Sequence, residues 1–234
     1  MDNRGLCERL SQVQEHIHVA CQRSHRNERD VLLVVVTKRH PVEAIQELFR
    51  QGQRHFGENR LPEALEKLPQ LPDEAIWHMI GHLQSNKAKQ AAQLSWVQSL
   101  SSVSAALALQ KELERTQRSL EVLVEVKTSP EEAKLGLGSF EELEALAQAL
   151  TSCSRLRVRG LMTMAPQTSD EGLIRQSFRT LRDWRERAAS RFPWASWDHL
   201  SMGMSQDFEL AIEEGSTLVR VGTAIMGPPP EETP

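Results

Sequence analysis

The chain has 234 residues, of which 39% are hydrophobic, so it is long enough to bury one large core. Its 28 Lys and Arg against 32 Asp and Glu give a formal net charge of −4, which argues against nucleic acid as the main partner. Three cysteines (Cys7, Cys21 and Cys153) without CxxC spacing predict neither a disulfide framework nor a zinc site, and we expect no metal.

Two features bear on where the protein acts. The first ten residues lack the apolar core of a secretory signal. The longest wholly aliphatic run, residues 31–36, is too short to span a bilayer. We therefore expect a cytoplasmic protein with no membrane partner.

The predicted elements alternate in type after an N-terminal helix over residues 4–27. Short apolar runs predict strands at 31–37, 54–57, 76–80, 96–99, 121–126, 157–162, 197–200 and 218–221. Amphipathic stretches between them predict helices at 42–51, 62–68, 85–93, 104–117, 140–150, 172–187 and 206–214. Strands separated by helices, mostly without hairpin turn signals, are typical of parallel βαβ units.

The spacing of these units predicts the fold class, α/β. The strand starts run from 31 to 218 over seven intervals, about 27 residues each, which suits a βαβ repeat. Eight units fit a single (β/α)8 TIM barrel with an extra N-terminal helix, and an open doubly wound sheet is the alternative. We expect one barrel domain over residues 1–227 and a disordered Pro-rich tail over 228–234.

Lys38 is the first candidate site residue, because active sites of such barrels lie at the carboxyl ends of the strands. It ends the most apolar predicted strand, where a lysine loses hydration and offers its neutral amine to an aldehyde. The alternative is a lysine that only marks the exit of the strand into solvent.

Two more candidates follow the last two predicted strands, where such barrels recurrently bind phosphate. Ser205 stands in a glycine-containing loop and is a plausible N-cap of the next helix, with Asp207 in its first turn. Arg220 interrupts a buried strand, so its guanidinium needs a fixed partner. That partner is either a ligand or an acid on a neighbouring strand.

Two loop residues are weaker candidates. His82 has the chemistry of a general base, although a hydrogen-bonded loop histidine with no such role is the more common case. Met204 lies among several methionines near the predicted mouth, where an apolar lining against a flat ring is one interpretation and ordinary packing the other.

Several stretches together resemble one family, the pyridoxal-phosphate homeostasis proteins. The most specific is GSTLVRVGTAIMG at residues 215–227. The others lie at 36–41, 56–59, 77–87, 128–136, 160–166 and 200–212, so the similarity runs along nearly the whole chain. The resemblance implies the barrel of alanine racemase without the second, β-rich domain of that enzyme.

The resemblance also implies a cofactor site. Lys38 would hold pyridoxal 5′-phosphate as a Schiff base, and Asn59 and Met204 would line the cofactor. Phosphate would be bound by Ser205, Gly222 and Thr223, and Arg220 would meet either the ring nitrogen or the phosphate. No residue is assigned a catalytic role. The chain differs from the usual family pattern beside these residues, at Arg39–His40, Arg60 and Met226.

The function that this implies is intracellular vitamin B6 homeostasis, by a carrier or buffer that supplies apo-enzymes. The net charge of −4 and the lack of an obvious apolar surface helix lead us to expect a monomer. The alternative is a pyridoxal-phosphate-dependent racemase, but a racemase uses a tyrosine as one of two bases and the sequence contains none. His82 is the candidate replacement. A third interpretation, an interaction protein that has lost the cofactor, is motivated by the three differences.

Overall fold

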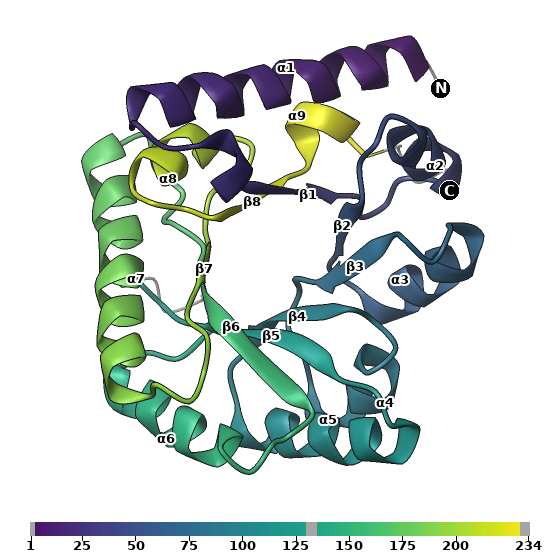
Figure 1. Ribbon diagram of the computed structural model, residues 1–234. Helices are drawn as coiled ribbons and strands as arrows, with labels where there is room; N and C mark the ends of the chain where they lie inside the picture. Colours follow the sequence, from purple (N-terminus) through teal and green to yellow (C-terminus); the bar gives the residue numbers. More distant parts are fainter. Residues whose placement is uncertain (1–2, 130–134, 230–234) are drawn as a thin grey trace.

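The structure is a computed structural model that describes residues 3–129 and 135–229. Within these residues, eight parallel strands pair in chain order into a closed barrel, with helices around the outside (Figure 1). The strands are β1 (Leu32–Val36), β2 (His55–Glu58), β3 (Ile76–Met79), β4 (Trp96–Leu100), β5 (Leu120–Glu125), β6 (Leu156–Met162), β7 (His199–Ser201) and β8 (Leu218–Val221). The predicted (β/α)8 barrel is therefore confirmed, and the open sheet was the wrong alternative.

The helices alternate with the strands along the chain, beginning with α1 before the first strand. They are α1 (Asn3–Arg23), α2 (Val42–Arg50), α3 (Leu61–Lys67), α4 (Ala88–Ala91), α5 (Val103–Thr116), α6 (Phe140–Leu150), α7 (Glu171–Arg191), α8 (Phe208–Glu213) and α9 (Thr223–Met226). Short 3-10 turns are η1 (Glu28–Asp30), η2 (Leu68–Gln70) and η3 (Ser85–Lys87). None of these described helices combines the length and apolar character needed to cross a membrane.

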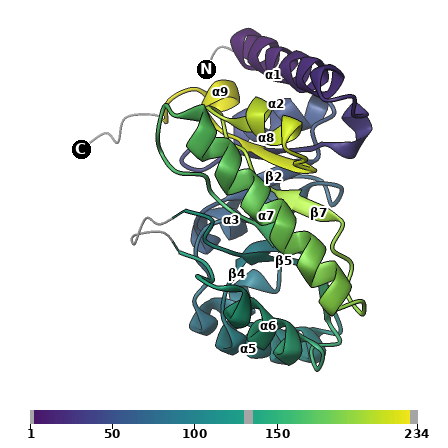
Figure 2. The ribbon, with the colours of Figure 1, turned by 90° about the vertical axis from the view of Figure 1, so that its left-hand side faces the viewer.

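Local side chains determine where several helices begin. Ser102 and Ser139 accept hydrogen bonds from backbone N–H groups in the first turns of α5 and α6. Asp170 does the same for α7, which runs along the side of the barrel in Figure 2. Each cap satisfies donors that a helix leaves unpaired at its N-terminus.

The barrel closes between the first strand and the last. Leu32 is in register with Leu218, and Val35 with Val221. The predicted extra helix, α1, lies outside this junction against α8 and α9 (Figure 1). Its buried residues Leu6, Leu10, Val13 and Ile17 form the helical stripe expected from the sequence.

Several predicted boundaries were wrong for local reasons. The seventh strand begins two residues later, because His199 is the first residue of this segment that pairs with β6. The helix expected over 85–93 is the turn η3 followed by α4, and α9 was not predicted. Of the predicted tail over 228–234, residues 230–234 lie outside the described residues.

Candidate functional site

A cavity of about 480 Å³ opens at the carboxyl ends of the strands, a volume in the range of small-molecule sites. All eight predicted site residues line it, namely Lys38, Asn59, His82, Met204, Ser205, Arg220, Gly222 and Thr223. Most of the remaining wall is apolar and includes Ile80, Met162, Met164 and Ile174. The structure thus brings together residues from both ends of the chain, as the barrel prediction required.

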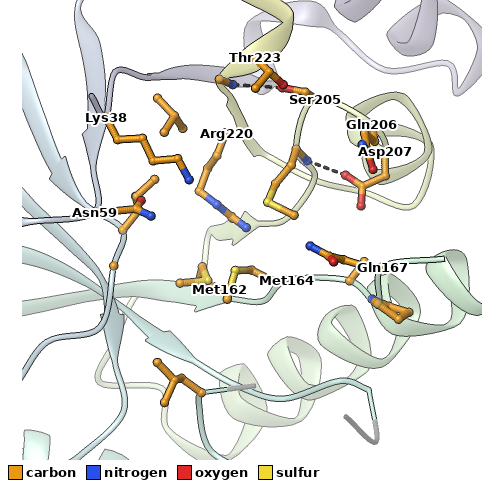
Figure 3. A pocket seen from close by; sticks show the side chains of 18 of the residues that line it. Lys38, Asn59, Met162, Met164, Gln167, Ser205, Gln206, Asp207, Arg220 and Thr223 are labelled. Atoms are coloured by element: carbon orange, nitrogen blue, oxygen red, sulfur yellow. Dashed lines mark hydrogen bonds between the residues drawn. The ribbon is translucent and has the colours of Figure 1, made fainter. Parts of the chain in front are cut away.

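Lys38 follows β1 in a tight turn and points into the cavity toward Arg220 (Figure 3). The turn is closed by the N–H of His40, which donates to the carbonyl of Thr37 at 3.1 Å. No hydrogen bond or ion pair joins the Lys38 amine to another residue in the described part of the chain. The amine is therefore available to a ligand.

Arg220 projects inward from β8 and is almost completely buried. Its Nη1 donates to the Ser201 hydroxyl at 2.6 Å, and its Nη2 donates to the Thr163 carbonyl at 2.8 Å. Among the described residues no carboxylate forms a salt bridge with it, so the ion-pair alternative was wrong. Burial lowers the pKa of Arg220 to about 10, while the charges of Asp207 and Glu125 oppose that shift. The guanidinium is therefore cationic at neutral pH.

A chain of buried hydrogen bonds continues from Arg220 through the barrel interior. Ser201 Oγ donates to Gln98 Oε1 at 2.6 Å, and Gln98 Nε2 donates to His78 Nδ1 at 2.9 Å. His78 Nε2 lies 2.9 Å from His55 Nδ1. Burial lowers the pKa of His55 to about 4 and that of His78 well below its ordinary value, so both rings are neutral at pH 7. A neutral His78 that accepts a hydrogen bond at Nδ1 carries its proton at Nε2 and donates from there. In each hydrogen bond of this series the donor is then the residue nearer to Arg220.

The predicted phosphate site differs in one detail. Ser205 does not cap α8, because that helix begins later, with Asp207 in the N-cap position. The Ser205 hydroxyl instead accepts from the backbone N–H of Gly222 at 3.2 Å (Figure 3). It also accepts from the backbone N–H of Ala224 at 3.3 Å. Asp207 accepts from the N–H of Met204 at 2.6 Å. The two hydrogen bonds of Ser205 hold its hydroxyl against the backbone that follows β8, at the wall of the cavity.

Two loops of the site pass so close to their neighbours that only glycine fits at one position in each. A Cβ on Gly203, which has a φ of +96°, would lie 2.6 Å from the Cβ of Ala211, so only glycine lets this loop pass α8. A Cβ on Gly81 would lie 2.1 Å from the carbonyl oxygen of Asn59. Close backbone contact there fixes the loop that carries Asn59, which is exposed at the cavity edge. His82, the next residue, is exposed at the same edge.

Sequence reasoning missed Glu125. This residue ends β5, is only 3% exposed and lines the cavity, while its Oε2 has no hydrogen-bond partner. Burial raises the pKa of Glu125 to about 7, although the Arg220 charge opposes the shift. The signal was an acid inside a buried strand, which the sequence analysis did not single out.

Comparisons with known proteins show the family to which this chain belongs. The family model of the alanine racemase N-terminal domain matches residues 9–230. The chain is 40% identical over 225 residues to the pyridoxal phosphate homeostasis protein of Aquifex aeolicus. This match covers 95% of this chain and 98% of that protein. The chain belongs to the pyridoxal phosphate homeostasis protein family.

Solved structures extend the comparison. This family member is 35% identical to PipY of Synechococcus elongatus with PLP bound, with a TM-score of 0.83 over 95% of this chain and 100% of that one. A histidine racemase from Leuconostoc mesenteroides shares the fold, with a TM-score of 0.71 at 20% identity. The match covers 94% of this chain but 58% of the racemase, so the family member corresponds to part of that enzyme.

Proposed function

We propose that this protein binds pyridoxal 5′-phosphate in the cavity, covalently through Lys38, and acts as a carrier or buffer in intracellular vitamin B6 homeostasis. The observation that carries the proposal is the placement of the unpaired Lys38 amine in the same cavity as the hydroxyls of Ser205 and Thr223 and the guanidinium of Arg220, which are groups that can bind a phosphate. An aldehyde that bears a phosphate needs both. The PLP-bound PipY structure, 35% identical over its full length, is the matching precedent.

The residues present fit the cofactor. Lys38 would bind the aldehyde carbon, and Ser205, Gly222 and Thr223 would hold the phosphate at the start of α9. Arg220 would face the ring, because Ser201 and Thr163 hold its guanidinium at the cavity floor. Asn59 and Met204 would line the ring faces. The bound cofactor supplies an electrophilic aldehyde and an electron-accepting ring.

Arg220 would also restrain the chemistry of the cofactor. A guanidinium with a pKa of about 10 keeps its protons at neutral pH, so it would not pass one to the ring nitrogen. A ring without that proton is a weaker electron sink. This favours storage of the cofactor over turnover of amino acids. We accordingly propose a cytoplasmic monomer that supplies apo-enzymes and is not itself an enzyme.

Visible absorbance, borohydride reduction and peptide mapping test the proposal. We expect a yellow protein whose reduced adduct maps to Lys38, and a Lys38→Ala variant that stays folded but traps no cofactor. Undiminished trapping in that variant would refute the assignment of the anchor. A wild-type protein that stays colourless with added cofactor would refute the function and favour an interaction protein that has lost its ligand.

A racemase is the second candidate, since the fold is shared with racemases and His82 and Glu125 line the same cavity as Lys38. The sequence contains no tyrosine to serve as the second base. Exchange of the α-proton of amino acids in deuterated water decides between the two functions. Exchange that disappears in Lys38→Ala and in His82→Ala would establish catalysis, whereas exchange at the buffer rate would eliminate it.

A further inference from the structure

A buried ionic cluster lies beside the turn that carries Lys38. Lys67, the last residue of α3, is 6% exposed, and its Nζ makes three hydrogen bonds. It donates to Glu58 Oε1 at 2.7 Å, to Glu63 Oε1 at 2.6 Å and to the carbonyl of Thr37 at 2.9 Å. An ammonium group has three protons, so this cluster uses all of them.

The cluster holds the backbone on both sides of Lys38. On one side, the Thr37 carbonyl accepts from Lys67, and the Thr37 hydroxyl donates to Glu58 Oε1 at 2.7 Å. On the other side, the backbone N–H of Arg39 donates to Glu63 Oε1. Glu58 and Glu63 thus bind the two neighbours of Lys38, and Lys67 links the two carboxylates.

Arg39 shows that this restraint is needed. Its φ is +63°, a left-handed conformation that costs a residue with a side chain about 1–2 kcal/mol. Such a conformation persists only when the surroundings determine it. The hydrogen bond from the Arg39 N–H to Glu63 and the turn closed by His40 provide that restraint.

We propose that Glu58, Glu63 and Lys67 are positioning residues, which fix the backbone of Lys38 so that its amine faces the cavity. The inference rests on the proposed role of Lys38 as the cofactor anchor. It also explains why Lys67 does not compete for the aldehyde, since its amine is committed to three acceptors and does not line the cavity. A long flexible side chain reacts faster when its backbone is held in place.

Glu63 is the residue to change, because its side chain is 21% exposed, whereas the side chain of Glu58 is fully buried. Glu63→Ala removes the acceptor of the Arg39 N–H, whereas Glu63→Gln keeps an oxygen at that place. Glu66→Ala is the matched control, since Glu66 is an exposed glutamate on the same helix.

The primary readout is the rate at which pyridoxal 5′-phosphate becomes trappable on Lys38 by borohydride. We expect Glu63→Ala to slow capture about tenfold or more, with Glu63→Gln and Glu66→Ala close to wild type. Pyridoxine 5′-phosphate, which has no aldehyde, should bind all four proteins with equal affinity, because the phosphate site is untouched. Equal capture rates in wild type and Glu63→Ala would overturn the proposal.

Hydrogen exchange of the Arg39 amide gives a second readout that needs no cofactor. We expect slow exchange in wild type and Glu63→Gln, and faster exchange in Glu63→Ala. Unchanged exchange in Glu63→Ala would also overturn the inference. If wild type captures no cofactor on Lys38 while Arg39 exchange responds as expected, the proposed function fails and the positioning of the turn stands.

Discussion

Arg220 and Ser201 lie 19 positions apart in the sequence, yet Nη1 of the first donates to Oγ of the second at 2.6 Å, deep inside the barrel. This bond connects the cavity to the interior, because the Ser201 hydroxyl in turn donates to Gln98. The direction in which Arg220 faces therefore depends on residues that never reach the cavity.

The substitution Gln98→Leu tests whether this buried series of hydrogen bonds stabilises the fold. It leaves the Ser201 hydroxyl and Nδ1 of His78 without their partner, and each unpaired buried group costs about 1–3 kcal/mol. We expect a loss of that size per group in the free energy of unfolding, measured with urea. Gln148→Leu, on the exposed side of α6, is the control. A Gln98→Leu variant as stable as this control would contradict the buried chain.

Glu125 should make stability depend on pH. Its folded-state pKa of about 7 lies above the ordinary value of 4.5, so the folded protein holds this proton more tightly than the unfolded chain does. The resulting stability is present below pH 4.5 and is lost as the pH rises to about 7. At 1.36 kcal/mol per pKa unit the loss is at most about 3 kcal/mol.

Urea unfolding of wild type and Glu125→Gln between pH 4.5 and 8 measures this effect. The other titrating groups are common to both proteins, so their contributions cancel in the difference. We expect the variant to gain stability relative to wild type as the pH rises through about 7, with the difference levelling off near pH 8. A difference that stays constant across the range would show that Glu125 is not buried as described.

Gly203 should tolerate no side chain. Gly203→Ala combines an unfavourable positive φ with a Cβ only 2.6 Å from Ala211, and we expect a loss of about 2–4 kcal/mol in unfolding free energy. Gly52→Ala is a matched control, because Gly52 has a φ of +94° but nothing within 4 Å of the added Cβ. The difference between the two variants isolates the steric contact, and equal losses would show that the loop moves aside.

Lys67 should stabilise the fold chiefly by neutralising buried Glu58. Lys67→Met leaves that carboxylate unpaired, and removal of one partner from a buried pair costs about 3–5 kcal/mol. The double variant Lys67→Met with Glu58→Gln removes both charges and should recover a substantial part of the loss. Thermal and urea unfolding of the two variants measure this, and a double variant no more stable than Lys67→Met would argue against the pair.

Much of this protein was predictable from its sequence, because strand ends converge on one face of a parallel barrel. Lys38 and Arg220 could be placed together from the strand pattern alone. Gln98 and His78 could not, since their contact depends on which side chains point inward across neighbouring strands. Lys67 looks like any lysine at a helix end, and only the tertiary fold buries it. The cap at Ser205 was wrong because a serine can bond a distant loop as readily as its own helix.

The pairing of β1 with β8 has a consequence for how the protein is made. Leu32 finds its partner only when Leu218 is available, and the cavity draws Lys38 from near one end of the chain and Thr223 from near the other. A nascent chain on the ribosome therefore presents Lys38 before the cavity residues Arg220, Gly222 and Thr223 are available. The cavity can form only after β8 has left the exit tunnel, so a ligand that needs residues from both sides of this junction can bind only once β8 has paired with β1.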